Sequence, residues 1–189
     1  MHIFNQEMRV HSFLVLFFLL SLVRVSAQNK IHWISTDKIN QTIKKGDKKF
    51  IIYYYINGCK WCHYMDDSTL SNPSIAKYIN QFFYPIKIDA MSENKIQVGE
   101  QTYGTQQVGK YTFNELALTM LNGRMSFPSI VFLDNQFNKI QTFDTYMDVP
   151  DFEIVVTYFG SDHYKKTMFR RYAHSFCREQ HFNNYVNGN

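Results

Sequence analysis

The sequence is poor in cysteine, with only Cys59, Cys62 and Cys177 among its 189 residues. A closed structural zinc site needs about four ligands, so scattered histidines would have to complete one. We therefore expect no bound metal. Cys59 and Cys62 are close enough in sequence to pair with each other. Cys177 is then an odd thiol, either free and reactive or paired with another molecule.

A strong charge of either sign is also missing. The chain carries a formal net charge of +4 at pH 7, which is too mild to indicate nucleic acid as a partner. The basic residues are concentrated near the end, among aromatic residues. We interpret residues 163–189 as a basic C-terminal extension. It forms either a terminal helix packed by its aromatic face or, as the alternative, an amphipathic helix that touches a partner or an anionic surface.

Long apolar runs are absent except near the N-terminus, from Phe13 to Val23. This run is too short for a comfortable membrane span of roughly 20 residues. It follows the basic Arg9 and precedes small residues that end at Ala27, the pattern of a secretory signal peptide. We expect residues 1–27 to be removed before Gln28, leaving an exported, soluble, periplasmic protein of bacterial type. An uncleaved membrane anchor is the alternative.

The remaining chain alternates between strand and helix patterns. Strands are expected at 30–35, 50–56, 82–90, 128–134 and 139–146, and the last two are joined as a hairpin. Helices are expected at 36–46, 59–70, from 72 onwards, at 112–123 and at 148–160. Residues 50–56 are apolar without interruption, which predicts a strand buried on both faces. The order predicts an α/β fold with a central mixed sheet flanked by helices.

The segment from Met91 to Asn122 is set apart from this pattern. Its first part, up to Lys110, is polar and contains three glycines, and no repeat or low-complexity tract occurs in it. We interpret it as an insertion or a substrate-facing region.

Residues 57–65 read NGCKWCHYM and contain two overlapping motifs. Cys59 and Cys62 have the C-x-x-C spacing of a redox dithiol. With His63 they also spell C-x-x-C-H, the attachment signature of a c-type haem, in which His63 would be the proximal ligand. A haem needs a pocket around a large planar group, whereas Cys59 follows a strand expected inside a sheet. The carboxyl end of such a strand is where open α/β sheets place their chemistry, which favours the dithiol.

Dithiol exchange needs one exposed, easily ionised thiol and a second thiol close by. Cys59 at a helix N-terminus is exposed to unpaired amide donors and the positive end of the helix dipole, which favour its thiolate. Lys60 and protonated His63 add positive charge. Cys62, one turn further, is placed to resolve a mixed disulfide. Trp61, between them, is expected to be an exposed aromatic residue that contacts substrate.

The chain resembles the thioredoxin superfamily, and more narrowly exported thioredoxin-like proteins, over about residues 31–160. The resemblance rests on the run C-K-W-C-H-Y-M from Cys59 to Met65 and on the pair Phe127-Pro128 ahead of a strand. It implies a thioredoxin-like domain at 28–162, with an insertion before a strand that Pro128 opens with a cis bond. It also implies that Cys59 is the nucleophile, that Cys62 resolves, and that Phe127 and Pro128 shape a groove for the substrate backbone.

The implied function is thiol-disulfide oxidoreduction outside the cytoplasm, with no cofactor other than the Cys59-Cys62 disulfide. Its implied partners are protein thiols or disulfides and a membrane thiol-disulfide relay. Two departures speak against a general cytosolic-type reductant: Tyr53 stands where many thioredoxins have a buried acid, and Gly58 where they have tryptophan. The non-enzymatic alternative is a binding module with a structural disulfide.

Overall fold

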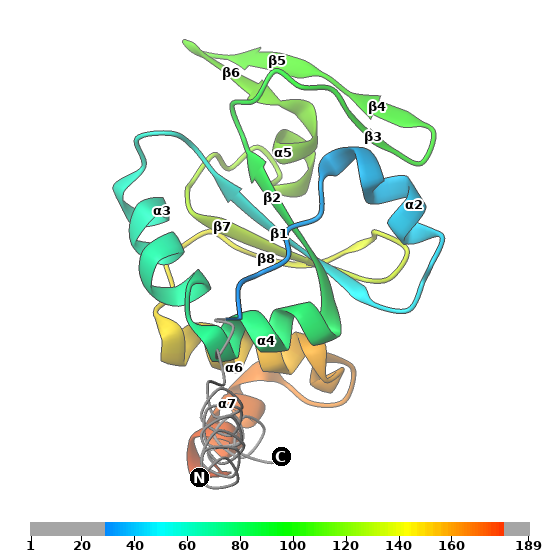
Figure 1. Cartoon of the computed structure of the whole chain (residues 1–189). Coiled ribbons are helices and arrows are strands. Elements are labelled where there is room, and N and C mark those ends of the chain that lie inside the picture. Colours follow the sequence, from blue (N-terminus) through cyan, green and yellow to red (C-terminus); the bar gives the residue numbers. More distant parts are fainter. Residues whose placement is uncertain (1–28, 180–189) are drawn as a thin grey trace, which may run out of the picture.

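The structure is a computed structural model that describes residues 29–179, and side chains as far as Phe176 (Figure 1). The predicted signal peptide and its cleavage site lie outside the described residues, as does the side chain of Cys177. Across residues 29–179, no helix has the length and apolar character needed to cross a membrane.

A four-stranded mixed sheet forms the centre of the fold, with strand order β2-β1-β7-β8. The strands are β1 (Lys49–Tyr55), β2 (Phe83–Asp89), β7 (Ser129–Leu133) and β8 (Lys139–Phe143). β1 pairs in parallel with β2 and antiparallel with β7, and β7 pairs antiparallel with β8. The predicted α/β fold with a central mixed sheet is confirmed.

Helices cover both faces of this sheet (Figure 1). In chain order they are η1 (Thr36–Lys38), α2 (Ile39–Ile43), α3 (Lys60–Tyr64), η2 (Met65–Leu70), α4 (Pro73–Phe82), α5 (Glu115–Met120), α6 (Val149–Gly160), η3 (His163–Lys165) and α7 (Phe169–Glu179). The N-caps follow from the sequence, because short polar side chains satisfy free amides at helix starts. Asn72 accepts hydrogen bonds from the amides of Ser74 and Ile75 at 2.9 and 3.2 Å.

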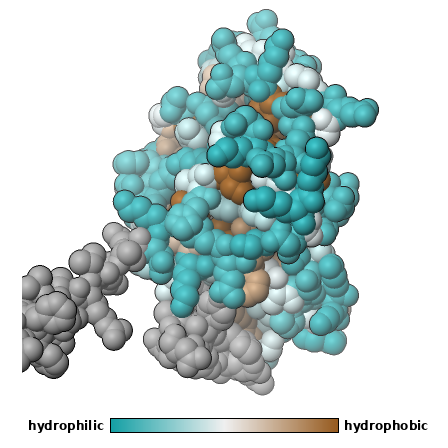
Figure 2. Space-filling view, turned by 45° about the vertical axis from the view of Figure 1, so that its right-hand side comes forward, coloured by the Kyte–Doolittle hydropathy of each residue, from teal (hydrophilic) through white to brown (hydrophobic). Residues whose placement is uncertain are grey.

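Strand β1 separates two hydrophobic cores. Its residues Ile51 and Tyr53 pack into the core beneath α4 and α6, whereas Phe50, Ile52 and Tyr54 pack into the core beneath α2 and α5. This alternation is the period of two that a strand imposes, here with apolar side chains on both faces. A buried central strand therefore carries the chain to Cys59. The surface shown in Figure 2 is mostly hydrophilic, with small separate apolar patches.

In the first half of the chain, three predicted elements differ from the structure. Residues 30–35 are not a strand: the chain there is held by Asn80, whose side chain accepts from the His32 amide and donates to the Lys30 carbonyl. The predicted helix at 36–46 is a short 3-10 turn followed by five α-helical residues. The predicted helix at 59–70 changes from α-helix to π-helix at Met65, a feature that hydrophobic periodicity does not reveal.

The segment from 91 to 122 contains two hairpins before α5. β3 (Ile96–Val98) pairs with β4 (Gln101–Tyr103), and β5 (Thr105–Val108) pairs with β6 (Tyr111–Asn114). The helix predicted at 112–123 therefore begins only at Glu115, because Tyr111–Asn114 is a strand. In Figure 1 the hairpins extend beyond the helices and the central sheet at the top of the molecule.

Helix α7 packs by its aromatic face. Tyr172 and Phe176 are each 7% exposed and belong to the core beneath α4 and α6. The Tyr172 ring centroid lies 5.1 Å from that of Tyr158 on α6. In the described part of the C-terminal extension, the structure therefore contains a terminal helix that packs by its aromatic face.

Candidate active site

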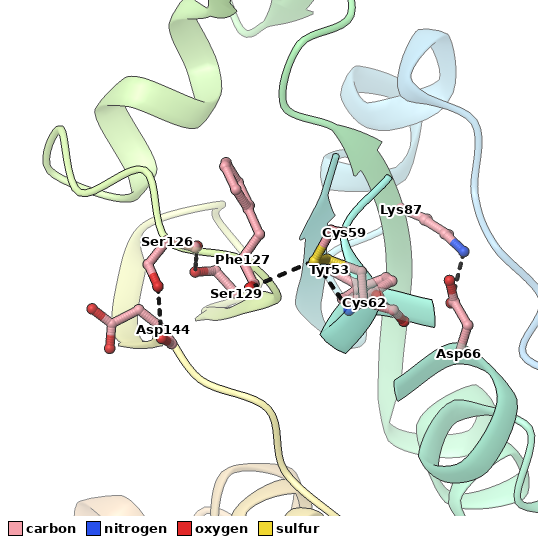
Figure 3. Close-up of a disulfide and its surroundings, with 9 residues drawn as sticks. All are labelled: Tyr53, Cys59, Cys62, Asp66, Lys87, Ser126, Phe127, Ser129 and Asp144. Carbon is pink, nitrogen blue, oxygen red and sulfur yellow. Dashed lines mark hydrogen bonds and ion pairs between the residues drawn. A yellow bond between two sulfur atoms is a disulfide. The ribbon is translucent and has the colours of Figure 1, made fainter. Parts of the chain in front are cut away.

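The two cysteines of the C-x-x-C motif lie where β1 passes into α3 (Figure 3). Gly58 has φ +77°, a left-handed conformation that glycine adopts without steric cost, and it turns the chain out of the strand. Cys59 is the N-cap of α3, and its Sγ is bonded to Sγ of Cys62 at 2.16 Å, with the two Cα atoms 5.3 Å apart. The predicted pair therefore forms a disulfide at a helix start.

The two cysteines differ in exposure. Cys62 is buried, at 2% exposed, whereas Cys59 is partly exposed. The amide of Cys62 donates to Sγ of Cys59 at 3.1 Å. When the pair is reduced, this donor favours a negative charge on Cys59, because an amide hydrogen bond stabilises a thiolate more than a thiol. When reduced, Cys59 is thus the more accessible thiol and is supported by an amide, whereas Cys62 is buried. Disulfide exchange requires this difference between the attacking and the resolving thiol.

The loop before β7 faces Cys59. The peptide bond between Phe127 and Pro128 is cis, as the resemblance implied. The carbonyl oxygen of Phe127 lies 3.6 Å from Sγ of Cys59, close enough for a reduced Cys59 to donate its S–H to it. Two serine hydroxyls hold this loop: Ser129 donates to the Ser126 carbonyl at 2.7 Å, and Ser126 donates to the Asp144 carbonyl at 3.2 Å.

Aromatic rings cover the helix start beside the disulfide. Trp61 is 56% exposed, and its ring centroid lies 5.4 Å from that of Tyr146 and 5.8 Å from that of Tyr64. The predicted exposure of Trp61 is confirmed, and its contact with substrate stays a prediction. Tyr146, which lies 85 residues from Trp61 in sequence, was not anticipated by any local pattern.

The two residues expected to add positive charge have partners of their own. The ammonium of Lys60 lies 5.7 Å from the ring centroid of Tyr64. Nε2 of His63 lies 3.2 Å from Oδ2 of Asp67, and its side chain is 78% exposed. Their influence on the thiolate of Cys59 stays a prediction, and the carboxylate of Asp67 would offset part of the positive charge of a protonated His63.

A group of polar residues behind Cys62 was not predicted. The hydroxyl of Tyr53 donates to the Cys62 carbonyl at 3.0 Å, and burial raises the pKa of Tyr53, so that this hydroxyl stays protonated. On β2, Lys87 pairs with Asp66 at 2.7 Å, and its ammonium lies 4.8 Å from the ring centroid of Tyr55. Two features could have indicated this group of residues. The pairing of β1 with β2 sets Lys87 opposite Tyr53, and Asp66 lies one helical turn after Cys62 in the sequence.

A pocket of about 380 Å³ adjoins the disulfide. Its lining includes Cys59, Cys62, His63 and Asp66, together with the end of β1. Both cysteine residues therefore line one open pocket beside the disulfide.

In the part of the chain with described side chains, no three His, Cys, Asp or Glu residues are grouped to hold a metal ion. The haem interpretation requires thioether bonds from both cysteines and His63 as an axial ligand. Here the cysteines are bonded to each other, and the imidazole of His63 points into solvent toward Asp67. The geometry favours the dithiol over haem attachment.

Comparison with known proteins agrees with this architecture. The family model described as "Thioredox_DsbH: Protein of unknown function, DUF255" matches residues 20–156. Among solved structures, a thioredoxin-fold protein from Helicobacter pylori is similar, with a TM-score of 0.56 and 19% identity over 70% of this chain and 86% of the other. A structure titled "DsbH Oxidoreductase" has a TM-score of 0.50 and 16% identity over 71% of this chain and 88% of that one.

A comparison with curated protein sequences gave no significant match. The two structural likenesses concern the fold, whereas the family match spans most of the described chain and includes the C-x-x-C motif. Together with the Cys59-Cys62 disulfide, this match supports thiol-disulfide oxidoreductase activity. By sequence and by fold, the chain belongs to the DsbH-like thioredoxin family.

Proposed function

We propose that the protein exchanges disulfides with exported proteins outside the cytoplasm, with Cys59 as the attacking thiol and Cys62 as the resolving thiol. The observation that carries the proposal is the position of the disulfide: Cys59 is partly exposed, and its Sγ receives the Cys62 amide at 3.1 Å and lies 3.6 Å from the Phe127 carbonyl. A structural disulfide needs neither a reachable sulfur nor a donor directed at it.

In the reductive direction, the Cys59 thiolate attacks one sulfur of a substrate disulfide. The Cys59–substrate S–S bond forms, the substrate S–S bond breaks, and the second substrate sulfur leaves as a thiolate that takes a proton from water. Cys62 then loses its proton to water and attacks Sγ of Cys59. The Cys59-Cys62 bond forms and the first substrate sulfur is released, so that two electrons pass from the pair to the substrate.

Oxidation of a substrate dithiol is the reverse sequence, and the reduction potential of the pair decides which direction prevails. Export is proposed from the signal-peptide pattern at residues 1–27. In an oxidising compartment the reduced pair needs a supply of electrons, which we assign to a membrane thiol-disulfide relay.

Trapping experiments test the unequal roles of the two thiols. Cys62→Ser should accumulate substrate proteins as mixed disulfides with Cys59, because nothing resolves them, whereas Cys59→Ser should trap few or none. Cys177→Ser serves as the control and should leave insulin-disulfide reduction nearly unchanged, since two thiols suffice. Equal trapping by the two variants would contradict the unequal roles. No trapping by Cys62→Ser, together with equal alkylation rates for the two cysteines of the reduced parent protein, would identify the bridge as structural.

A further inference from the structure

Two large apolar side chains are exposed where the chain passes from η3 into α7. Met168 is 73% exposed, the highest fraction among the large apolar residues that the structure describes, and Phe169 beside it is 39% exposed. Neither residue belongs to either hydrophobic core. A single exposed apolar side chain needs no explanation, but two neighbours can mark a contact surface, so their surroundings decide.

The backbone holds these two side chains in place. The hydroxyl of Tyr158 on α6 donates to the carbonyl of Thr167 at 2.6 Å. The carbonyl of Met168 accepts the first amides of α7, from Arg171 at 3.0 Å and from the next residue at 3.1 Å. The ring of Phe169 meets that of Tyr158 edge-on, with the centroids 5.2 Å apart. The exposure of Met168 is therefore set by the fold at the start of a helix.

Cations flank the two apolar side chains on both sides. All four are exposed, and they are Lys165, Lys166, Arg170 and Arg171. From residue 163 to residue 176 the sequence contains no aspartate or glutamate. Lys165 pairs with Asp162 at 3.0 Å, whereas the other three cations have no ion pair with any residue that the structure describes.

These four cations account for the net positive charge of the chain. The sequence has 20 lysines and arginines and 16 aspartates and glutamates. Without the four, the basic residues would number 16 and would equal the acidic ones. The attraction of the protein for an anionic partner is therefore concentrated at the start of α7.

The pattern fits a lipid surface better than a protein partner. A stable protein interface buries at least about 1,200 Å² around an apolar centre, and lysine is depleted there. Here only two apolar side chains are exposed, and two of the four surrounding cations are lysines. At a bilayer surface, by contrast, apolar side chains enter the boundary of the acyl chains while cations contact the phosphates.

We propose that residues 165–171 attach the protein to the surface of an anionic phospholipid bilayer, with Met168 and Phe169 entering the headgroup layer. The proposal goes beyond disulfide exchange and does not depend on it. In Figure 1, α7 lies at the bottom of the molecule and α3 lies above it at the left, so a bilayer beneath α7 leaves the redox site open. The attachment is reversible, because so small a contact binds far more weakly than a membrane-spanning helix.

Co-sedimentation with vesicles tests this attachment on protein purified from the exported fraction. One set of vesicles contains equal parts of phosphatidylcholine and phosphatidylglycerol, and the other contains phosphatidylcholine alone. We expect binding only to the first set, and we expect it to weaken as salt screens the cations. Met168→Ser should lower the partition coefficient roughly fivefold, because one apolar side chain no longer enters the bilayer. Val108→Ser, which removes an exposed apolar side chain from the β5–β6 hairpin, should leave the coefficient unchanged.

A pair of charge reversals tests the cations. Arg170→Glu with Arg171→Glu should lower the partition coefficient at least tenfold, since each cation near an anionic surface contributes about one order of magnitude or slightly less. Lys95→Glu with Lys110→Glu makes the same change in net charge at exposed positions beside the hairpins, at the opposite end of the molecule in Figure 1. This matched control should retain most of the binding. Circular dichroism checks that each variant is folded.

Equal binding to the two sets of vesicles, or an equal loss in the two charge variants, would overturn the attachment. Binding to polyglutamate that is as strong as vesicle binding and insensitive to Met168→Ser would identify an acidic polypeptide as the partner and would overturn it as well. If a reversal variant is unfolded, Arg170→Gln with Arg171→Gln and Lys95→Gln with Lys110→Gln give the same comparison with half the change in charge.

Discussion

The hydroxyl of Tyr53 donates a hydrogen bond of 3.0 Å to the main-chain carbonyl of Cys62, joining the central strand to the helix that carries the resolving cysteine. That carbonyl also accepts the amide of Met65, so two donors fix its position. The ammonium of Lys87 lies 5.3 Å from the Tyr53 ring centroid on the neighbouring strand. Many thioredoxins have a buried acid at this position of the strand. Here the residue is Tyr53, whose neutral hydroxyl donates the hydrogen bond that positions α3.

Tyr53→Phe should lower the free energy of unfolding by about 1 kcal/mol, the usual net contribution of one buried hydrogen bond. The loss stays modest because the Cys62 carbonyl keeps the Met65 amide as a partner. Urea denaturation of the oxidised protein measures it. An unchanged unfolding midpoint would show that the hydrogen bond to Cys62 contributes nothing.

The effect of Tyr54→Phe on the free energy of unfolding should differ from that of Tyr53→Phe and should not be a loss. Tyr54 is fully buried in the other core, and among the described residues its hydroxyl has no hydrogen-bond partner. Removing a buried hydroxyl without a partner should leave stability unchanged or raise it by up to about 1 kcal/mol. The same urea denaturation compares these neighbouring tyrosines directly, and a loss as large as that of Tyr53→Phe would contradict the assignment.

The core of this fold could be predicted because its strands are apolar and its helices begin with recognisable caps. The strand predicted at 50–56 is β1 (Lys49–Tyr55), and the helix predicted from 72 onwards is α4, with Asn72 as its N-cap. The pair Phe127-Pro128 likewise opens β7. In each case one short stretch of sequence contains the whole signal.

The missed features depend on residues far apart in sequence or on exposed backbone. The strands of the β5–β6 hairpin are mostly polar and exposed, so they lack the alternation that identifies a half-buried strand. The contact between Trp61 and Tyr146 depends on the return of the chain after β8. Conversely, residues 30–35 have a strand-like composition but only one backbone hydrogen bond to the sheet, from Ile34 to Pro85.

Gly160→Ala should destabilise the fold by about 1–3 kcal/mol, the usual cost of overpacking a core. Gly160 ends α6, and an added Cβ would lie 2.7 Å from both Cε1 and the hydroxyl oxygen of Tyr78, which is itself buried. Gly104→Ala is the matched control, since its nearest neighbour would be the Glu115 carboxylate at an ordinary 3.7 Å. Thermal denaturation compares the two, and an equal shift in both variants would contradict this packing argument.

Glu153→Gln should change how stability depends on pH. Burial raises the pKa of Glu153 from 4.5 to about 6, so between these values the folded state holds more of its proton than the unfolded state does. Stability therefore falls as pH rises from about 4.5 to 6, and the glutamine variant should lose this part of the fall. Glu100→Gln, at an exposed position, is the control. A pH profile parallel to that of the parent would show that Glu153 titrates alike in both states.

The central claim is that Cys59 and Cys62 are a redox dithiol, and their equilibrium with glutathione tests it most directly. Oxidised and reduced protein are quantified by thiol alkylation over a series of glutathione ratios, with Cys177→Ser to exclude the third thiol. We predict a reversible two-electron transition within the range of thioredoxin-like pairs, roughly −270 to −120 mV. A pair that stays oxidised below about −300 mV would behave as a structural disulfide and would contradict the account.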